Sequence, residues 1–210
     1  MKRMNHVPGP PPNDPYRGRT GQVTFGGLGP GARWAYVGLV ALTCLGFFGA
    51  VGLLTAAAIG ADGGAPDDTL LGAGMITFVI TMLLFYALIF VGLYWLYKAW
   101  DWLPNEQRYT KNWRGWISPA QASLFLLIPY FHYYWMFVVN CGLCDALDRM
   151  RVTYPTREAA PKTLAIAACI CQLVVPLPVG AIMWLVFMSK IERMTREMAS
   201  ASLPQMPHAV

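Results

Sequence analysis

Four long apolar stretches dominate the pattern of hydrophobic and polar positions along this chain. They occupy residues 34–60, 70–97, 119–144 and 163–189, and polar segments separate them. Each stretch contains the ~20 residues that an α-helix needs to cross the hydrocarbon layer of a bilayer. The pattern therefore predicts an all-α integral membrane protein with four transmembrane helices.

Prolines interrupt the third and fourth stretches. The third opens with Ser118 and Pro119, a typical helix N-cap followed by proline at the first helical position. Pro129 then removes a backbone hydrogen bond and clashes with the preceding turn, so the helix has to kink or break there. Pro176 and Pro178 lie near the middle of the fourth stretch. We therefore expect the third and fourth transmembrane helices to be kinked at these prolines.

The two ends of the chain differ from the apolar stretches. Residues 1–33 hold six prolines and seven glycines with few aliphatic side chains. Such a segment cannot bury enough apolar surface to offset the entropy lost on ordering. We expect a disordered cytoplasmic tail at 1–33, a transmembrane domain at 34–199 and a flexible tail at 200–210.

Charge strengthens the membrane interpretation. Only 13% of the residues are charged, against about 25% in a soluble domain. All 16 Lys and Arg residues lie outside the four stretches, and the connection at 61–69 has none of them, only three aspartates. Because cytoplasmic loops carry the excess of Lys and Arg, this connection faces outward. With four spans both termini are cytoplasmic.

The third stretch also allows a second topology, in which it enters the membrane and returns to the same side. With four spans, 12 basic residues lie inside and the 4 of the 145–162 connection lie outside. If only the third stretch returns, 13 lie inside and 3 outside. The count does not separate the two. We favour four spans, because irregular backbone at membrane depth needs cover from protein or water.

Two sets of residues are typical of membrane helices. Small side chains share one face of the first stretch and favour close helix packing: Gly49, Gly52, Ala56 and Gly60. Tryptophans cluster with basic residues after the second stretch, which predicts anchoring at the cytoplasmic headgroups: Trp95, Trp100, Trp102, Trp113 and Trp116. The basic residues form no single periodic face, so we expect no nucleic-acid partner.

One segment is similar to a known family. The run LYWLYKAW, followed by ISPAQASLFLLIPYFHYYWMFVVNCGLCDAL, resembles uncharacterised bacterial inner-membrane proteins with a domain of unknown function. The resemblance covers Leu93 to Leu147. Its anchors are Ser118-Pro119, Ile128-Pro129, Tyr134-Trp135 and Gly142-Leu143. It implies a multi-spanning architecture located in the bacterial inner membrane, and no particular chemistry.

Polar side chains within the third stretch are the candidate functional groups. His132 and Asn140 share a helix face, and the resembling family does not have histidine at the first position. They either line a path for a proton, ion or small solute, or they bond freed carbonyls and neighbouring helices within the bundle.

Cys141 and Cys144 form a CxxC pair, which suggests thiol-disulfide chemistry. Against it, no flanking base or helix N-terminus would lower a thiol pKa, and buried cysteines mostly act as small apolar residues. One CxxC with a single histidine is too sparse for a zinc site. We expect no metal, no cofactor and no catalytic residue.

These features together predict a multi-pass, non-catalytic accessory or interaction subunit of a membrane complex. Its partners would be the lipid bilayer and other membrane proteins or further copies of itself. Two alternatives stay open: a small-solute or ion transport component using His132 and Asn140, and a membrane thiol-disulfide oxidoreductase using Cys141 and Cys144.

Overall fold

The computed structural model describes residues 30–59, 67–174 and 179–202. Its described part is mostly helical, which confirms the all-α class. The α-helices are α1 Pro30–Ile59, α2 Asp68–Trp102, α3 Pro119–Leu124, α4 Phe131–Met150, α5 Lys162–Val174 and α6 Val179–Ser202. Two 3-10 helices, η1 Asn105–Gln107 and η2 Phe125–Leu127, and a small hairpin of β1 Tyr109–Thr110 and β2 Gly115–Trp116 complete it. Residues 1–29 and 203–210 of the predicted tails lie outside the described residues.

Helices α1 and α2 form a long antiparallel hairpin. Tyr36 and Leu88 line one pocket at one end of the contact, and Gly74 lies against Leu54 near the other. Asp67 caps α2, because its Oδ1 accepts from the backbone N–H of Thr69 at 2.9 Å. Both helices are long and apolar enough to cross a membrane, over Trp34–Ile59 and Asp68–Trp102.

The third apolar stretch is two helical segments with a chain reversal between them, rather than one kinked span. Ser118 and Gln121 form the capping box that starts α3. The backbone then becomes extended at Ile128, and Tyr130 has a positive φ of 61°. Helix α4 returns alongside α3, because Trp135 Nε1 donates to the carbonyl of Gln121 at 3.1 Å. Pro129 therefore marks a break with reversal, which corrects the expected kink.

The fourth stretch is likewise two helices, α5 and α6, that run antiparallel. Glu158, just before α5, pairs with Arg193 at 2.6 Å, whereas Gln172 near the end of α5 bonds Trp184 near the start of α6. Pro176 and Pro178 lie outside the described residues. With α5 only 13 residues long, the described residues contain two candidate spans and not clearly four.

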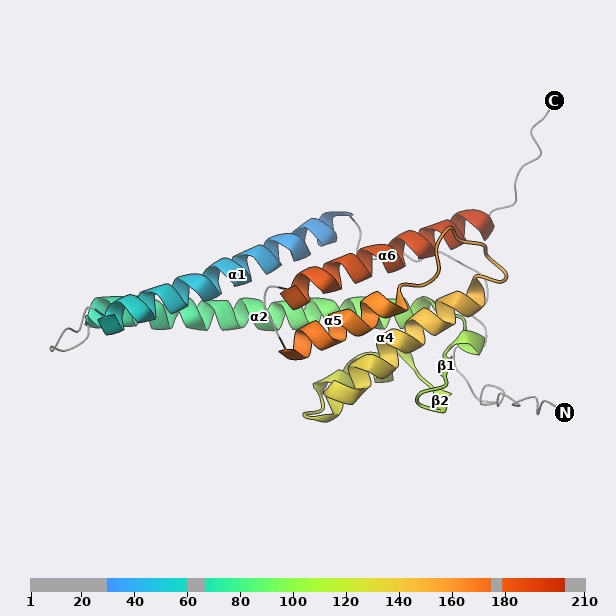
Figure 1. Cartoon of the computed structure of the whole chain (residues 1–210), viewed down its shortest axis with the longest axis horizontal. Coiled ribbons are helices and arrows are strands. Elements are labelled where there is room, and N and C mark those ends of the chain that lie inside the picture. Colours follow the sequence, from blue (N-terminus) through green and yellow to red (C-terminus); the bar gives the residue numbers. More distant parts are fainter. Residues whose placement is uncertain (1–29, 60–66, 175–178, 203–210) are drawn as a thin grey trace, which may run out of the picture.

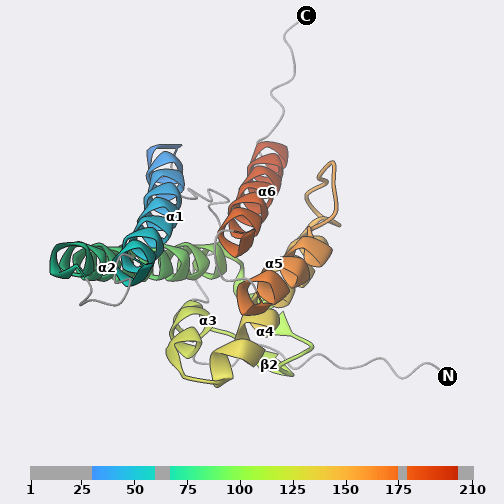
Figure 2. The same ribbon diagram turned by 60° about the vertical axis from the view of Figure 1, so that its left-hand side comes forward.

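The remaining helices gather beside the second half of α2. Figure 1 shows α1 alone accompanying the first half of α2, with α4, α5 and α6 alongside the rest. Turning the molecule keeps this arrangement and shows α3 beside the start of α4 (Figure 2). The largest buried side chains of the core lie here, among them Trp95, Trp100 and Trp135. The described helices thus form an arm, made of α1 and the first half of α2, and a base, in which α3, α4, α5 and α6 lie beside the second half of α2.

Two arginines hold the connection between α2 and α3 onto the base. Arg108 Nε donates to the Leu103 carbonyl at 2.9 Å. Arg149, from α4, donates through Nη2 to the carbonyl of Gln107 at 2.6 Å. Where this connection crosses α4, Gly142 leaves room for it: a Cβ there would lie 2.6 Å from Thr110 Cγ2 and 3.5 Å from Trp100.

We expect Gly142→Leu to destabilise the base by about 1–3 kcal/mol, because a side chain at this position would push Thr110 and Trp100 away from α4. Thermal unfolding in detergent, followed by circular dichroism, measures the loss. Gly72→Leu is the matched control, since nothing lies within 4 Å of a Cβ at that position in α2. An equal unfolding temperature for the two variants would contradict the close approach at Gly142.

Candidate functional site

His132 and Asn140 belong to one helix, α4, but not to one site. Eight residues of helix separate them, a rise of about 12 Å. His132 lies in the first turn beside the chain reversal, half-buried, with its ring centroid 3.8 Å from that of Tyr133. Asn140 lies in the middle of α4 and is fully buried. The pair therefore does not converge on a common ligand position.

Asn140 ties α4 to itself and to α5. Its Nδ2 donates to the Met136 carbonyl at 2.7 Å and lies 4.0 Å from Cys169 Sγ. Its Oδ1 is buried and has no hydrogen-bond partner in the described part of the chain. An unpaired buried acceptor is uncommon. Asn140 is therefore a predicted polar residue with a buried hydrogen-bonding atom that has no partner among the described residues.

Cys141 and Cys144 lie on α4 one turn apart, and both are buried. Neither forms a disulfide, and Cys44, Cys169 and Cys171 are free as well. Burial raises the pKa of both thiols, and for Cys144 the charges of Asp148 and Asp145 raise the pKa further. The charge of Lys162 lowers the pKa of both thiols, but by less than burial raises it. At neutral pH both side chains are therefore protonated thiols.

An ion pair that sequence reasoning missed lies beside these thiols. Lys162 Nζ contacts Asp145 Oδ1 at 2.7 Å, which joins the start of α5 to α4. This hydrogen bond raises the pKa of Lys162. The two residues are 17 positions apart, and no sequence pattern indicated that α5 folds back onto α4.

The structure describes no metal centre. Within residues 30–59, 67–174 and 179–202, no group of three His, Cys, Asp or Glu side chains is placed to hold a metal ion.

The five tryptophans occupy different surroundings. Trp95 and Trp100 are buried in the core, and Trp95 Nε1 donates to Glu192 Oε1 at 3.1 Å. This differs from the expected headgroup belt, because side chains covered by protein cannot contact headgroups. Trp102 and Trp116 are half-buried, and Trp113 is exposed. Contact with headgroups stays a prediction for these three residues.

The small-residue face of α1 points away from α2. Gly49, Gly52 and Ala56 are exposed, and a Cβ at either glycine would meet nothing within 4 Å. Gly60 lies outside the described residues. Close packing on α2 uses Gly46 instead, which lies against Thr81. The predicted face is therefore available to a further helix, and the internal contact uses another face.

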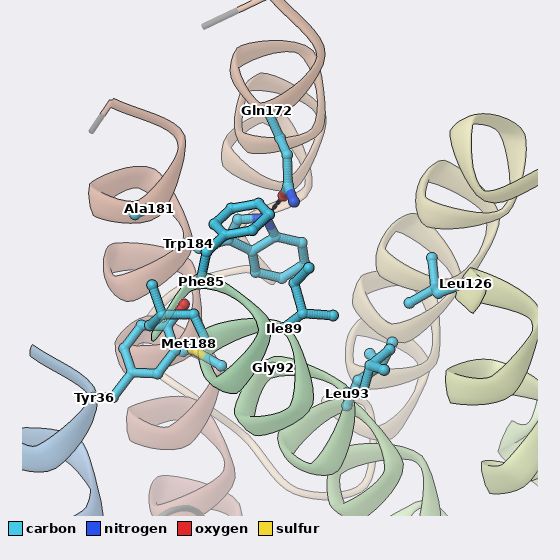
Figure 3. Close-up of a pocket in the computed structure, with 12 residues that line it drawn as sticks. Tyr36, Phe85, Ile89, Gly92, Leu93, Leu126, Gln172, Ala181, Trp184 and Met188 are labelled. Carbon is cyan, nitrogen blue, oxygen red and sulfur yellow. Dashed lines mark hydrogen bonds between the residues drawn. The ribbon is translucent and has the colours of Figure 1, made fainter. Parts of the chain in front are cut away.

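An apolar cavity of about 150 Å³ lies where α1, α2, α5, α6 and η2 meet. Figure 3 shows Trp184 and Met188 of α6 facing Phe85 and Ile89 of α2 across it. Its polar features are the hydrogen bond between Gln172 and Trp184 and the Tyr36 hydroxyl. Five segments contribute to its lining, so no local sequence signal could have revealed it.

Comparison of the chain with protein-family models, with curated proteins and with solved structures gives no match. The resemblance of Leu93 to Leu147 to bacterial inner-membrane proteins stays a prediction.

We expect Asn140→Leu to change the free energy of unfolding by less than about 1 kcal/mol, because it removes a buried unpaired acceptor together with one donor. Asn140→Asp, which keeps the shape and adds a charge that burial penalises, should destabilise by several times that amount. Thermal unfolding in detergent compares the two. A larger loss for leucine than for aspartate would show that the amide has a polar partner.

We expect Cys141 and Cys144 to resist alkylation at pH 7 in the folded protein, because the thiolate is the reactive form and burial holds both pKa values up. Modification should stay low even as the pH passes the ordinary thiol value of about 8.5, because the raised pKa delays formation of the thiolate, and it should be complete after unfolding. Mass spectrometry of maleimide-treated protein measures it. Rapid modification of either residue at pH 7 would contradict the burial of the pair.

Proposed function

We propose that this chain is an integral membrane protein with α1 and α2 as its transmembrane helices. The observation that carries the proposal is the exposure of their apolar side chains. Within the most apolar 18 residues of each helix, only 17% in α1 and 11% in α2 are buried. Large contiguous apolar surface is costly in water and marks contact with membrane or protein.

The charge pattern supports an orientation. The connection between α1 and α2 contains no Lys or Arg, whereas basic residues lie at the start of α1 and at the end of α2. By the excess of Lys and Arg on the cytoplasmic side, we propose that this connection faces outward and that both termini are cytoplasmic. The resemblance of Leu93 to Leu147 is our ground for proposing the bacterial inner membrane.

Within that membrane we propose a non-catalytic role as an accessory or interaction subunit. Two features support it. The thiols of α4 are buried and protonated, which does not suit nucleophilic chemistry. The exposed face of Gly49, Gly52 and Ala56 lets another helix approach closely, and such approach drives helix association in lipid. The partner would be another membrane protein or a second copy of the chain.

A transport component is the second candidate, and one observation favours it. The Oδ1 atom of Asn140 is buried without a partner in the described residues, as expected of a group that meets a transient ligand or water. The distance between Asn140 and His132 along α4 weakens any proposal that uses both. A thiol-disulfide oxidoreductase has no comparable support.

Purification of the tagged chain in a mild detergent tests the accessory role. We expect a stoichiometric partner, or a dimer, that Gly52→Leu releases because the larger side chain holds the partner helix away. Ala58→Leu is the matched control, an exposed small residue of α1 about 120° around the helix from Gly52. Recovery of the wild-type chain as a lone monomer would contradict the accessory role. Equal retention of a partner by both variants would exclude this face.

A further inference from the structure

We infer, resting on the proposed membrane embedding of α1 and α2, that the α3–α4 and α5–α6 hairpins insert into the cytoplasmic leaflet and return to the cytoplasmic side. Lipid hydrocarbon would cover the exposed apolar side chains at the described ends of both hairpins.

The first observation is that charged side chains meet at one level of the base. Asp145 of α4 pairs with Lys162 of α5. Glu158, before α5, pairs with both Lys190 and Arg193 of α6, at 3.8 and 2.6 Å. Glu192 of α6 accepts from Trp95 of α2, three residues before Lys98. Helices α2, α4, α5 and α6 therefore all change from apolar to charged side chains at the same level of the base.

The second observation is that α2, α4, α5 and α6 carry no charged side chain on one and the same side of that level. From it toward the tips, Asp, Glu, Lys and Arg are absent from Phe131–Cys144 of α4, Thr163–Val174 of α5 and Val179–Ser189 of α6. Helix α2 has none over residues 69–97. Figure 1 shows α4, α5 and α6 inclined to α2, with the first half of α2 extending beyond them on one side.

The lengths of these uncharged segments match a whole bilayer and half a bilayer. The 29 residues of α2 correspond to ~44 Å of helix, close to the 40–45 Å of a bilayer with its headgroups. The 14, 12 and 11 residues of α4, α5 and α6 correspond to only ~21, ~18 and ~17 Å. The hairpins therefore reach about as deep as one leaflet.

The third observation is that the hairpin tips expose apolar and aromatic side chains. Tyr130 is 86% exposed, and Leu124 and Leu127 before it are exposed as well. At the other tip Leu173, Val174 and Ile182 are exposed. Lipid hydrocarbon covers such side chains without any further protein.

The count of basic residues agrees. If both hairpins return, all 16 Lys and Arg residues of the chain lie on the cytoplasmic side, against 12 with four spans. The four-span topology, and the topology in which only the third stretch returns, each place basic residues outside. They do so because the fourth stretch, or both the third and the fourth, cross the membrane in them. The irregular backbone at Ile128–Tyr130 makes internal hydrogen bonds, as membrane depth requires: the Ile128 N–H donates to the Phe125 carbonyl at 3.3 Å, and the Ile128 carbonyl accepts from the His132 N–H at 3.1 Å.

Cysteine accessibility in intact and permeabilised cells tests the inference. Val152, between α4 and α5, is 89% exposed, and four spans would place it outside. We expect Val152→Cys in the full chain to react with a membrane-impermeant maleimide only after permeabilisation, whereas Asp62→Cys, in the connection after α1, reacts in intact cells. The unsubstituted chain, with its five native cysteines, gives the background.

A second measurement tests the depth of the tip. A fluorophore on Tyr130→Cys, in the chain reconstituted into phosphatidylcholine vesicles, should be quenched by lipids brominated on the acyl chain, and the same fluorophore on Val152→Cys should not. Labelling of Val152→Cys in intact cells overturns the inference in favour of spanning. Equal lack of quenching at both positions overturns it in favour of a base lying in water. Recovery of the wild-type chain in the soluble fraction would instead reject the membrane embedding itself.

Discussion

Pro129 lacks an amide hydrogen, and its ring keeps the preceding residue out of the helical conformation. In this chain Ile128 becomes extended and Tyr130 takes a positive φ, so the backbone reverses direction within three residues. The position of α4, and of the helices that pack on it, depends on this reversal. Because α4 returns toward the end of α2, its charged last turns meet the polar connection after Trp102, and Arg149 reaches the carbonyls of that connection. A helix continuing past Pro129 would carry these charges to the opposite end of the molecule.

The buried carboxylate of Glu192 joins α6 to α2. Glu192 is only 3% exposed, and it accepts a hydrogen bond from Trp95. A buried charge is costly unless it is hydrogen-bonded or paired, so this contact fixes where α6 sits along α2. Phe187, five residues earlier in α6, packs edge-on against the same indole, with 6.1 Å between the ring centroids. These contacts hold α6 at the level where Asp145 of α4 pairs with Lys162 of α5.

The candidate chemistry is dispersed rather than concentrated. Asn140, Cys141 and Cys144 lie inside the base, His132 lies beside a hairpin tip, and the small-residue face of α1 lies on the arm. Such an arrangement suits a protein that presents surfaces to lipid and to other helices. The sequence pointed to each of these residues from its type and spacing. Whether they converge depended on the path of the chain after Pro129.

The sequence by itself determined the helices. Long apolar runs without charge predicted α1 and α2 to within a few residues, and Ser118-Pro119 predicted the start of α3, because propensity, capping and hydrophobicity act over short distances. It also located the break at Pro129. Only the tertiary structure decided that the chain turns back there and again after Val174. A proline removes a hydrogen bond without setting the direction that follows, and that direction comes from contacts between distant residues, Trp135 with Gln121 and Lys162 with Asp145.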